Sequence, residues 1–251
     1  MSLHHEISFE TEICEHLAAY GWLYAEGDAS RYDRSRAMFP PDLVDWVKTT
    51  QPDAWNALSK HHGAAAEASL IDRVRKQVEQ SGVLDVLRNG VGGYPLKKQL
   101  ALAQFKPAFT MNADLMARYQ ANRLRIVRQV RYSSANENSI DLVLFLNGLP
   151  VATCELKTDF TQSVQDAVDQ YRFDRNPKPK GQAAEPLLAF PNGALVHFAV
   201  SNSEVRMTTQ LKGPDTVFLP FNKGHNGAAG NPPNAHGHPT SYLWEEVWQR
   251  E

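Results

Sequence analysis

The sequence is poor in cysteine, in long apolar runs and in net charge. Its two cysteines, Cys14 and Cys154, are too few for a disulfide framework, and their separation does not match the C-x-x-C spacing of zinc sites. No apolar run approaches the roughly 20 residues that cross a bilayer, and the first residues lack the apolar middle region of a signal peptide. We therefore expect a protein of the reducing cytoplasm without a membrane partner.

The formal net charge of -2 excludes the overall basic excess of many small DNA-binding domains. Any contact with nucleic acid would therefore come from local basic segments, and residues 118–132 and 172–180 form two of these. The alternative for both segments is a solvated charged surface. The candidates for contacts with a DNA backbone are Arg123, Arg125, Arg128, Lys178 and Lys180.

Apolar spacing predicts the main elements of a chain of 251 residues, which is long enough to bury a core without disulfides. Spacings of three and four predict helices from Phe9, within 40–90 and at 163–175, whereas alternation predicts strands. These strands are expected near 98–105, 124–132, 140–147, 149–157, 195–200 and 204–208. The expected fold is α/β or α+β. A mixed sheet of about four to five strands would be flanked by helices in a single domain over 1–251, with a helical insertion at about 40–90. A loop and a short helix would occupy 211–251.

One apolar stretch, SIDLVLFLNGLPVATCELK, contains three charges that a buried hairpin does not need. Its turn is Asn147-Gly148, the strongest short-range hairpin signal. Glu155 and Lys157 are two residues apart and share one face of their strand. Pairing across the turn brings Asp141 beside residues 154–155, with the register open by one residue. Two carboxylates and one ammonium group therefore meet at one end of the hairpin.

Burying these charges is unfavourable unless they pair with each other or bind a metal ion. Two adjacent carboxylates favour a hard divalent cation, Mg²⁺ or Mn²⁺, as a third group. The alternative is a structural ion pair of Lys157 with Glu155 or Asp141 at a sheet edge. The setting favours a catalytic site, because the Glu-x-Lys ends an apolar strand, the Asp begins its partner and a defined turn joins them.

This hairpin, the segment FETEICEHLAAYGW and the tail VFLPFNKGHNGAAGNPP…TSYLWEEV resemble one known region. They are similar to the N-terminal nuclease region of the R (HsdR) subunit of type I restriction-modification enzymes, in the PD-(D/E)xK nuclease superfamily. The resemblance implies a type I site-specific deoxyribonuclease, an endonuclease that hydrolyses phosphodiester bonds of double-stranded DNA with Mg²⁺. It implies Asp141, Glu155 and the Leu156 carbonyl as metal ligands and Lys157 as the catalytic lysine. The methyltransferase (M) and specificity (S) subunits would be partners of the full-length subunit.

Two further positions follow from the resemblance. Such nucleases often place an acidic residue on the first helix, and Glu10 or Glu12 would be that residue; for both, the alternative is a favourable interaction with the helix dipole. A Gln-x-x-x-Tyr motif often follows the sheet. Here Gln170 matches, but Asp174 stands at the tyrosine position and Tyr171 is adjacent. Of this motif, the resemblance therefore implies a role for Gln170 alone, as a contact with DNA.

The chain has no G-x-x-x-x-G-K-[ST] phosphate loop. The resemblance implies that ATP dependence belongs to a helicase motor that follows this region in the full-length subunit. Two rival functions stay open: a PD-(D/E)xK repair-type nuclease outside restriction, and a non-catalytic nuclease-like module for DNA binding or docking, which would bind no metal.

Overall fold

The computed structural model describes residues 2–109, 111–159 and 162–250, with side chains from residue 7 onward. Its strands are β1 (Leu124–Arg131), β2 (Ser139–Leu146), β3 (Leu149–Leu156), β4 (Val196–Val200), β5 (Val205–Thr208) and β6 (Leu219–Pro220). The α-helices are α1 (Ser2–Ala19), α2 (Pro40–Thr50), α3 (Pro52–His62), α4 (Ala66–Ser81), α5 (Val83–Asn89), α6 (Ala113–Gln120) and α7 (Val164–Asp169). Short 3₁₀ turns are η1 (Asp28–Arg31) and η2 (Gly63–Ala65), and π-helical turns are η3 (Gln170–Asp174) and η4 (Leu243–Val247). Among these described helices, none has the length and apolar character of a membrane span.

A six-stranded mixed sheet, in the order β1-β2-β3-β4-β5-β6, forms the centre of the molecule. β3 and β4 are parallel and the other neighbouring pairs are antiparallel. A parallel pair needs a crossover connection, and α7 lies within it. The predicted α+β fold with a mixed sheet is confirmed, and the short edge strand β6 is an addition to it.

The turn between β2 and β3 fixes how the hairpin charges meet. Asn147 and Gly148 both have positive φ, 49° and 82°, as the predicted Asn-Gly turn requires. Leu146 pairs with Leu149 as expected, but the register shifts by one residue between Leu144 and Phe145. Leu142 therefore pairs with Cys154, and continuing this register sets residue 141 opposite residue 155. The shift resolves the register that the sequence left open.

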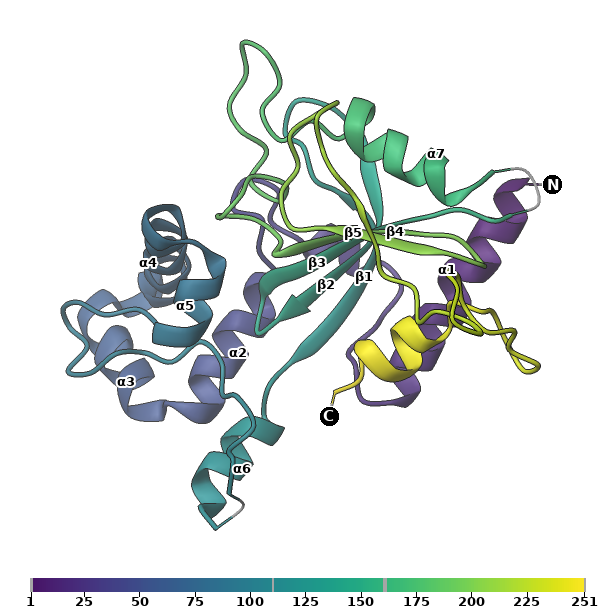
Figure 1. Cartoon of the computed structure of the whole chain (residues 1–251). Coiled ribbons are helices and arrows are strands. Elements are labelled where there is room, and N and C mark those ends of the chain that lie inside the picture. Colours follow the sequence, from purple (N-terminus) through teal and green to yellow (C-terminus); the bar gives the residue numbers. More distant parts are fainter. Residues whose placement is uncertain (1, 110, 160–161, 251) are drawn as a thin grey trace.

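The two faces of the sheet are covered by different parts of the chain (Figure 1). α1 and η4 pack on one face, where Phe9 and Ile13 meet Trp244 and Trp248 in one buried cluster. α7 and η3 lie on the other face, where Tyr171 is fully buried. Trp244 and Trp248 are 1% and 6% exposed, so η4 is part of the core of the described chain.

The helices α2–α5 form a separate cluster beside the β2–β3 turn, and α6 projects from the body (Figure 1). The helices α2–α5 coincide with the helical insertion predicted at about residues 40–90. Gly148 packs on the start of α2, since a Cβ there would lie 2.5 Å from the Phe39 carbonyl oxygen. The strand expected near 98–105 does not form. Only an isolated bridge joins Val91 and Leu100 there. The first helix starts at Ser2 rather than near Phe9.

Candidate active site

The predicted carboxylate pair is assembled where β2 begins and β3 ends. The Leu156 N–H donates to Asp141 Oδ2 at 2.8 Å, which ties the Asp141 side chain to the β3 backbone. Glu155 is fully buried. Its Oε1 accepts from Arg175 Nε at 2.7 Å, whereas its Oε2 is buried without a hydrogen-bond donor among the described residues. The site therefore contains one buried, unsatisfied carboxylate oxygen beside a second carboxylate.

This arrangement is electrostatically unfavourable for the isolated protein. Burial raises the pKa of Glu155 well above its ordinary value, and the neighbouring Asp141 carboxylate raises it further. Arg175 opposes both effects. Buried polar atoms are normally satisfied, so an unpaired carboxylate oxygen calls for an explanation. A positively charged group that is added to the site would remove the penalty.

A cavity of about 450 Å³ opens beside Asp141, and the fully buried Glu155 is not among its lining residues. Among its lining residues are five that the sequence predicted: Glu10, Arg128, Asp141, Lys157 and Gln170. Lys157 and Gln170 also line a neighbouring cavity of about 350 Å³. The alternation of β3 thus brings Lys157 to the cavity that Asp141 lines, and the crossover from β3 through α7 brings Gln170 there.

Two residues of the site had no role in the sequence prediction. Arg175 follows η3 and lines the cavity. Gln129, on β1, donates to both Glu10 Oε1 (2.8 Å) and Asp141 Oδ1 (3.2 Å). It has a φ of 49°, and non-glycine residues with such backbone strain often cluster at functional sites. Arg175 lies in the basic segment 172–180 and Gln129 in the basic segment 118–132, but neither belongs to a motif that would mark it as a site residue.

The structure distinguishes Glu10 from Glu12. Glu10 is 4% exposed and lines the cavity, while Glu12 is exposed and lies 3.2 Å from His238. Both carboxylate oxygens of Glu10 already accept hydrogen bonds, one from Arg128 and one from Gln129. Burial and Asp141 raise the pKa of Glu10, and these two donors lower it. Glu10 therefore lines the site as a hydrogen-bonded neighbour of the carboxylate pair.

The five basic residues that the sequence predicted as DNA contacts differ in burial and in their ion-pair partners. Arg125 is buried and pairs with Asp42 and Asp28, so its proposed contact with a DNA backbone is wrong: these carboxylates already neutralise it in the interior. Arg123 is half-buried and also pairs with Asp42. Arg128 lines the cavity and pairs with Glu10.

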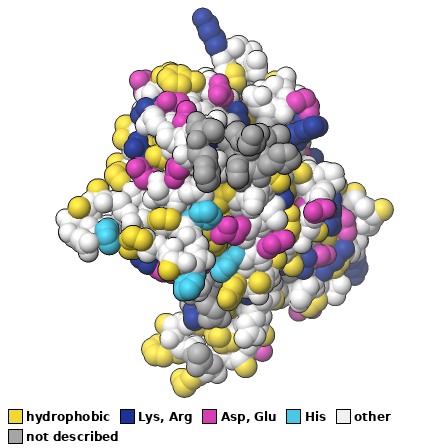
Figure 2. Space-filling model, turned by 90° about the vertical axis from the view of Figure 1, so that its right-hand side faces the viewer, with side chains coloured by type: hydrophobic (Ala, Val, Ile, Leu, Met, Phe, Trp, Pro, Cys, Tyr) yellow, Lys and Arg dark blue, Asp and Glu magenta, His cyan; other side chains and the backbone are white. Residues whose placement is uncertain are grey.

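The remaining basic candidates, Lys178 and Lys180, are exposed in the segment after η3. Figure 2 shows acidic and basic side chains intermingled on the face that it presents. On that face the local charges are mixed, in line with the small net charge of the chain.

Tyr171 is turned away from the cavity and anchors η3 to the sheet. Its hydroxyl lies 2.8 Å from Thr153 Oγ1, which lies 2.7 Å from His197 Nδ1. All three side chains are buried, and burial lowers the pKa of His197 to about 3. Tyr171 is therefore a core residue that fixes the position of its neighbour Gln170.

The donor set fits a hard divalent cation. The Asp141 carboxylate, Glu155 Oε2 and the backbone carbonyl of Leu156 are all oxygen donors, and Mg²⁺ is commonly held by one or two carboxylates while it keeps several waters. Within the described residues, no three His, Cys, Asp or Glu side chains are grouped closely enough to hold a metal ion. A site here would therefore rest on two carboxylates, without a third from Glu10.

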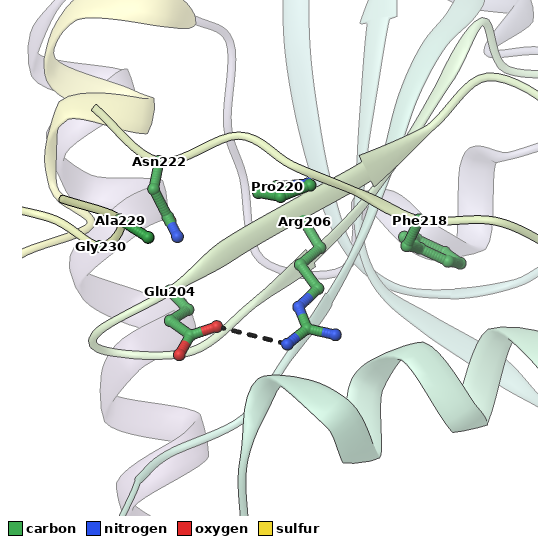
Figure 3. Close-up of a pocket in the computed structure, with 7 residues that line it drawn as sticks. All are labelled: Glu204, Arg206, Phe218, Pro220, Asn222, Ala229 and Gly230. Carbon is green, nitrogen blue, oxygen red and sulfur yellow. Dashed lines mark ion pairs between the residues drawn. The ribbon is translucent and has the colours of Figure 1, made fainter. Parts of the chain in front are cut away.

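A second, larger cavity of about 530 Å³ lies at the β5–β6 edge. Figure 3 shows Glu204 and Arg206 side by side in it, with an ion pair of 3.6 Å between them. Arg206 also donates to Gln165 of α7. None of the predicted site residues lines this cavity, so its size alone does not make it the active-site candidate.

The fold and the site define an α+β protein with a carboxylate pair and a lysine at the end of a central hairpin. Comparison with known families places this chain within one of them. The chain belongs to the family of type I restriction enzyme R protein N termini, whose model matches residues 5–216. A search of curated proteins found no match. The matched range includes Asp141, Glu155 and Lys157 and ends before β6 and η4, so the tail is not part of the match.

Proposed function

We propose that this chain is the Mg²⁺-dependent endonuclease part of a type I restriction enzyme R subunit, with a PD-(D/E)xK site that hydrolyses double-stranded DNA. The observation that carries the proposal is the buried Glu155 Oε2, which has no donor among the described residues and belongs to the carboxylate beside Asp141, a residue that lines one cavity together with Lys157. Buried ion pairs are favourable when hydrogen bonds satisfy their remaining lone pairs, and Arg175 satisfies one oxygen of Glu155. Family membership supports the restriction context.

Asp141 and Glu155 would hold the cation, with the Leu156 carbonyl as a further ligand. When bound, Mg²⁺ supplies Lewis-acid chemistry and lowers the pKa of coordinated water. The hydrogen bond from the Leu156 N–H keeps the Asp141 carboxylate in place, and the bond from Arg175 leaves Glu155 Oε2 as the oxygen for the cation. Mn²⁺ has similar ligand preferences and is expected to substitute.

Lys157 would stabilise the negative charge that develops on the phosphate and orient the attacking water. In the hydrolysis, the water oxygen bonds to phosphorus as one P–O ester bond breaks. One water proton is lost to solvent and the leaving oxygen takes up a proton. Gln170, which lines the same cavity, would contact the DNA beside the cleaved bond.

The DNA backbone would be held by the remaining basic candidates, Arg123, Arg128, Lys178 and Lys180. The M and S subunits would be partners through the full-length subunit, in the cytoplasm, and ATP would be used by its motor. The family match disfavours the repair-type alternative. The second alternative, a non-catalytic module, predicts the opposite result in the following test.

The test is DNA cleavage by the complete restriction complex, assembled with wild-type R subunit or with Asp141→Ala or Lys157→Ala. Each variant should lower the cleavage rate at least about 100-fold, the usual scale for removing a catalytic group, while ATP hydrolysis persists. Asp215→Ala, at an exposed aspartate, is the matched control and should cut normally. Normal cleavage by both site variants would support a docking module.

A further inference from the structure

Arg175 makes contacts that join both strands of the catalytic hairpin. Its Nε donates to Glu155 Oε1 on β3 at 2.7 Å, and its Nη2 donates to the Ser139 carbonyl on β2 at 2.8 Å. Ser139 is two residues before Asp141. One guanidinium group therefore bridges the two strands that carry the two carboxylates, beside the cavity that it lines.

The surroundings hold this guanidinium in one orientation. Its side chain is 9% exposed, and its Cζ lies 5.8 Å from the centre of the Tyr132 ring. The Arg175 N–H donates to the Gln170 carbonyl at 3.1 Å, which closes the π-helical turn η3. π-helical turns are rare and frequent at functional sites. Because Tyr171 anchors η3 to Thr153, the turn that presents Arg175 is fixed to the sheet.

The pattern of bonds on Glu155 differs from that of a structural ion pair. Buried ion pairs are favourable only when hydrogen bonds satisfy the remaining lone pairs. Here Arg175 occupies one oxygen of Glu155, and the other oxygen has no donor among the described residues. Arg175 thus pairs with one carboxylate of the pair, and the other, Asp141, lines the cavity.

We propose that Arg175 is a positioning residue of this site: its guanidinium ties the Glu155 carboxylate to the β2 backbone and thereby directs Oε2 toward the divalent cation. The inference rests on the proposed function and deepens it. It assigns no contact between Arg175 and the reacting atoms. A lysine can pair with Glu155 but lacks the planar fork that reaches two acceptors at once, so Arg175→Lys should restore the role only in part.

The test is Mn²⁺ binding by calorimetry to the wild-type chain, Arg175→Met, Arg175→Lys and the control Arg172→Met. Arg172 lies in η3 and donates to the Thr216 carbonyl, so its removal takes the same charge from the same segment. We expect binding at least ten-fold weaker in Arg175→Met, three- to ten-fold weaker in Arg175→Lys, and within two-fold of wild type in the control. Melting temperatures of all variants are measured alongside.

Wild-type affinity in a folded Arg175→Met variant would overturn the inference, and so would a loss no larger than in the control. If Arg175→Met does not fold, Arg175→Lys decides, and wild-type affinity in it overturns the inference. Absence of Mn²⁺ binding by the wild type would overturn the proposed function and the inference together. Wild-type binding that Asp141→Ala abolishes and Arg175→Met leaves intact would overturn the inference alone.

Discussion

At the scale of single residues, Asp141 and Glu155 oppose the stability of the fold. Glu155 is fully buried, and both its burial and the Asp141 charge raise its pKa. Arg175 compensates on one oxygen only. Natural proteins keep such unfavourable groups at functional sites, where they lower stability in exchange for activity. The carboxylate pair should therefore destabilise the chain when no cation is bound.

Asp141→Asn should raise the free energy of unfolding by about 1 kcal/mol, because it removes the repulsion of Glu155. The amide oxygen can still accept from the Leu156 N–H. Urea unfolding in the presence of a chelator measures the effect. The control Asp215→Asn, at an exposed position, should change stability by less than about 0.5 kcal/mol. A destabilised Asp141→Asn variant would contradict the account.

His197 should make stability depend on pH. Its pKa is lowered to about 3 in the folded protein, against about 6.5 when unfolded. The unfolded chain therefore binds a proton below pH 6.5 that the folded chain does not. This contribution is present in full above pH 6.5 and falls by about 2 kcal/mol between pH 7 and pH 5.

Urea unfolding at pH 7 and pH 5 measures this loss in wild type and in His197→Asn. The variant should lose about 2 kcal/mol less than wild type over this interval. His236→Asn, at an exposed position, should keep the wild-type pH dependence. An unchanged pH dependence in His197→Asn would show that this histidine does not titrate on unfolding.

Single residues also show what sequence can and cannot predict. Asp141, Glu155 and Lys157 were recognisable because alternation and an Asn-Gly turn relate them through short-range geometry. Arg175 was not, since its contacts with Ser139 and Glu155 depend on how η3 packs against the sheet. For the same reason, the sequence alone did not show that Arg125 is neutralised in the interior, because its partners Asp28 and Asp42 lie far away in the chain.

At the scale of elements, a buried ion network joins the helical insertion to the sheet. Asp42, in the first turn of α2, is fully buried and accepts from Arg125 and Arg123, both on or beside β1. Asp28, in η1, also pairs with Arg125. Removal of one partner of a buried network leaves an uncompensated charge, which is more destabilising than loss of the whole network.

Asp42→Ala should lower the free energy of unfolding by about 3–5 kcal/mol, because it leaves Arg125 partly unpaired in the interior. The matched control is Asp45→Ala on the same helix, which removes a half-exposed carboxylate 3.4 Å from Arg123 and should cost at most about 1 kcal/mol. Denaturant unfolding followed by circular dichroism compares the two. Equal effects would contradict the buried network.

The elements differ in how far sequence determines them. The β2–β3 hairpin is set by its turn and by alternation, and it was predicted within a residue. The stretch near 98–105 alternates too, but Leu100 and Leu102 pack into the helical cluster of α2–α5. The alternation in this stretch therefore reflects the burial of Leu100 and Leu102, although none of the described strands pairs with it. Pairing is a tertiary property that a single stretch does not contain.

At the level of the whole molecule, α1 near the start of the chain and η4 near its end pack together in one hydrophobic core. Phe9 of α1 lies against Trp244 of η4, with ring centres 5.7 Å apart, over the same face of the sheet. The family match ends at residue 216, yet this later segment completes the core in which α1 lies. The candidate site therefore depends on residues outside the matched range for the packing of α1.

Trp244→Ala should lower the free energy of unfolding by about 3–5 kcal/mol through the cavity that it leaves. Val247→Ala, in the same turn but 45% exposed, should change it by less than about 0.5 kcal/mol. Thermal and urea unfolding of both variants check this. A small effect of Trp244→Ala would mean that η4 does not belong to the folded core in solution.

We propose that the hairpin charges Asp141, Glu155 and Lys157 form a metal-dependent catalytic site. Calorimetric titration of Mn²⁺ into the wild-type chain and into Asp141→Ala measures whether they bind a cation. We expect saturable heat of binding near one ion per chain for the wild type and none for the variant. Absence of binding by the wild type, or equal binding by both proteins, would contradict this proposal.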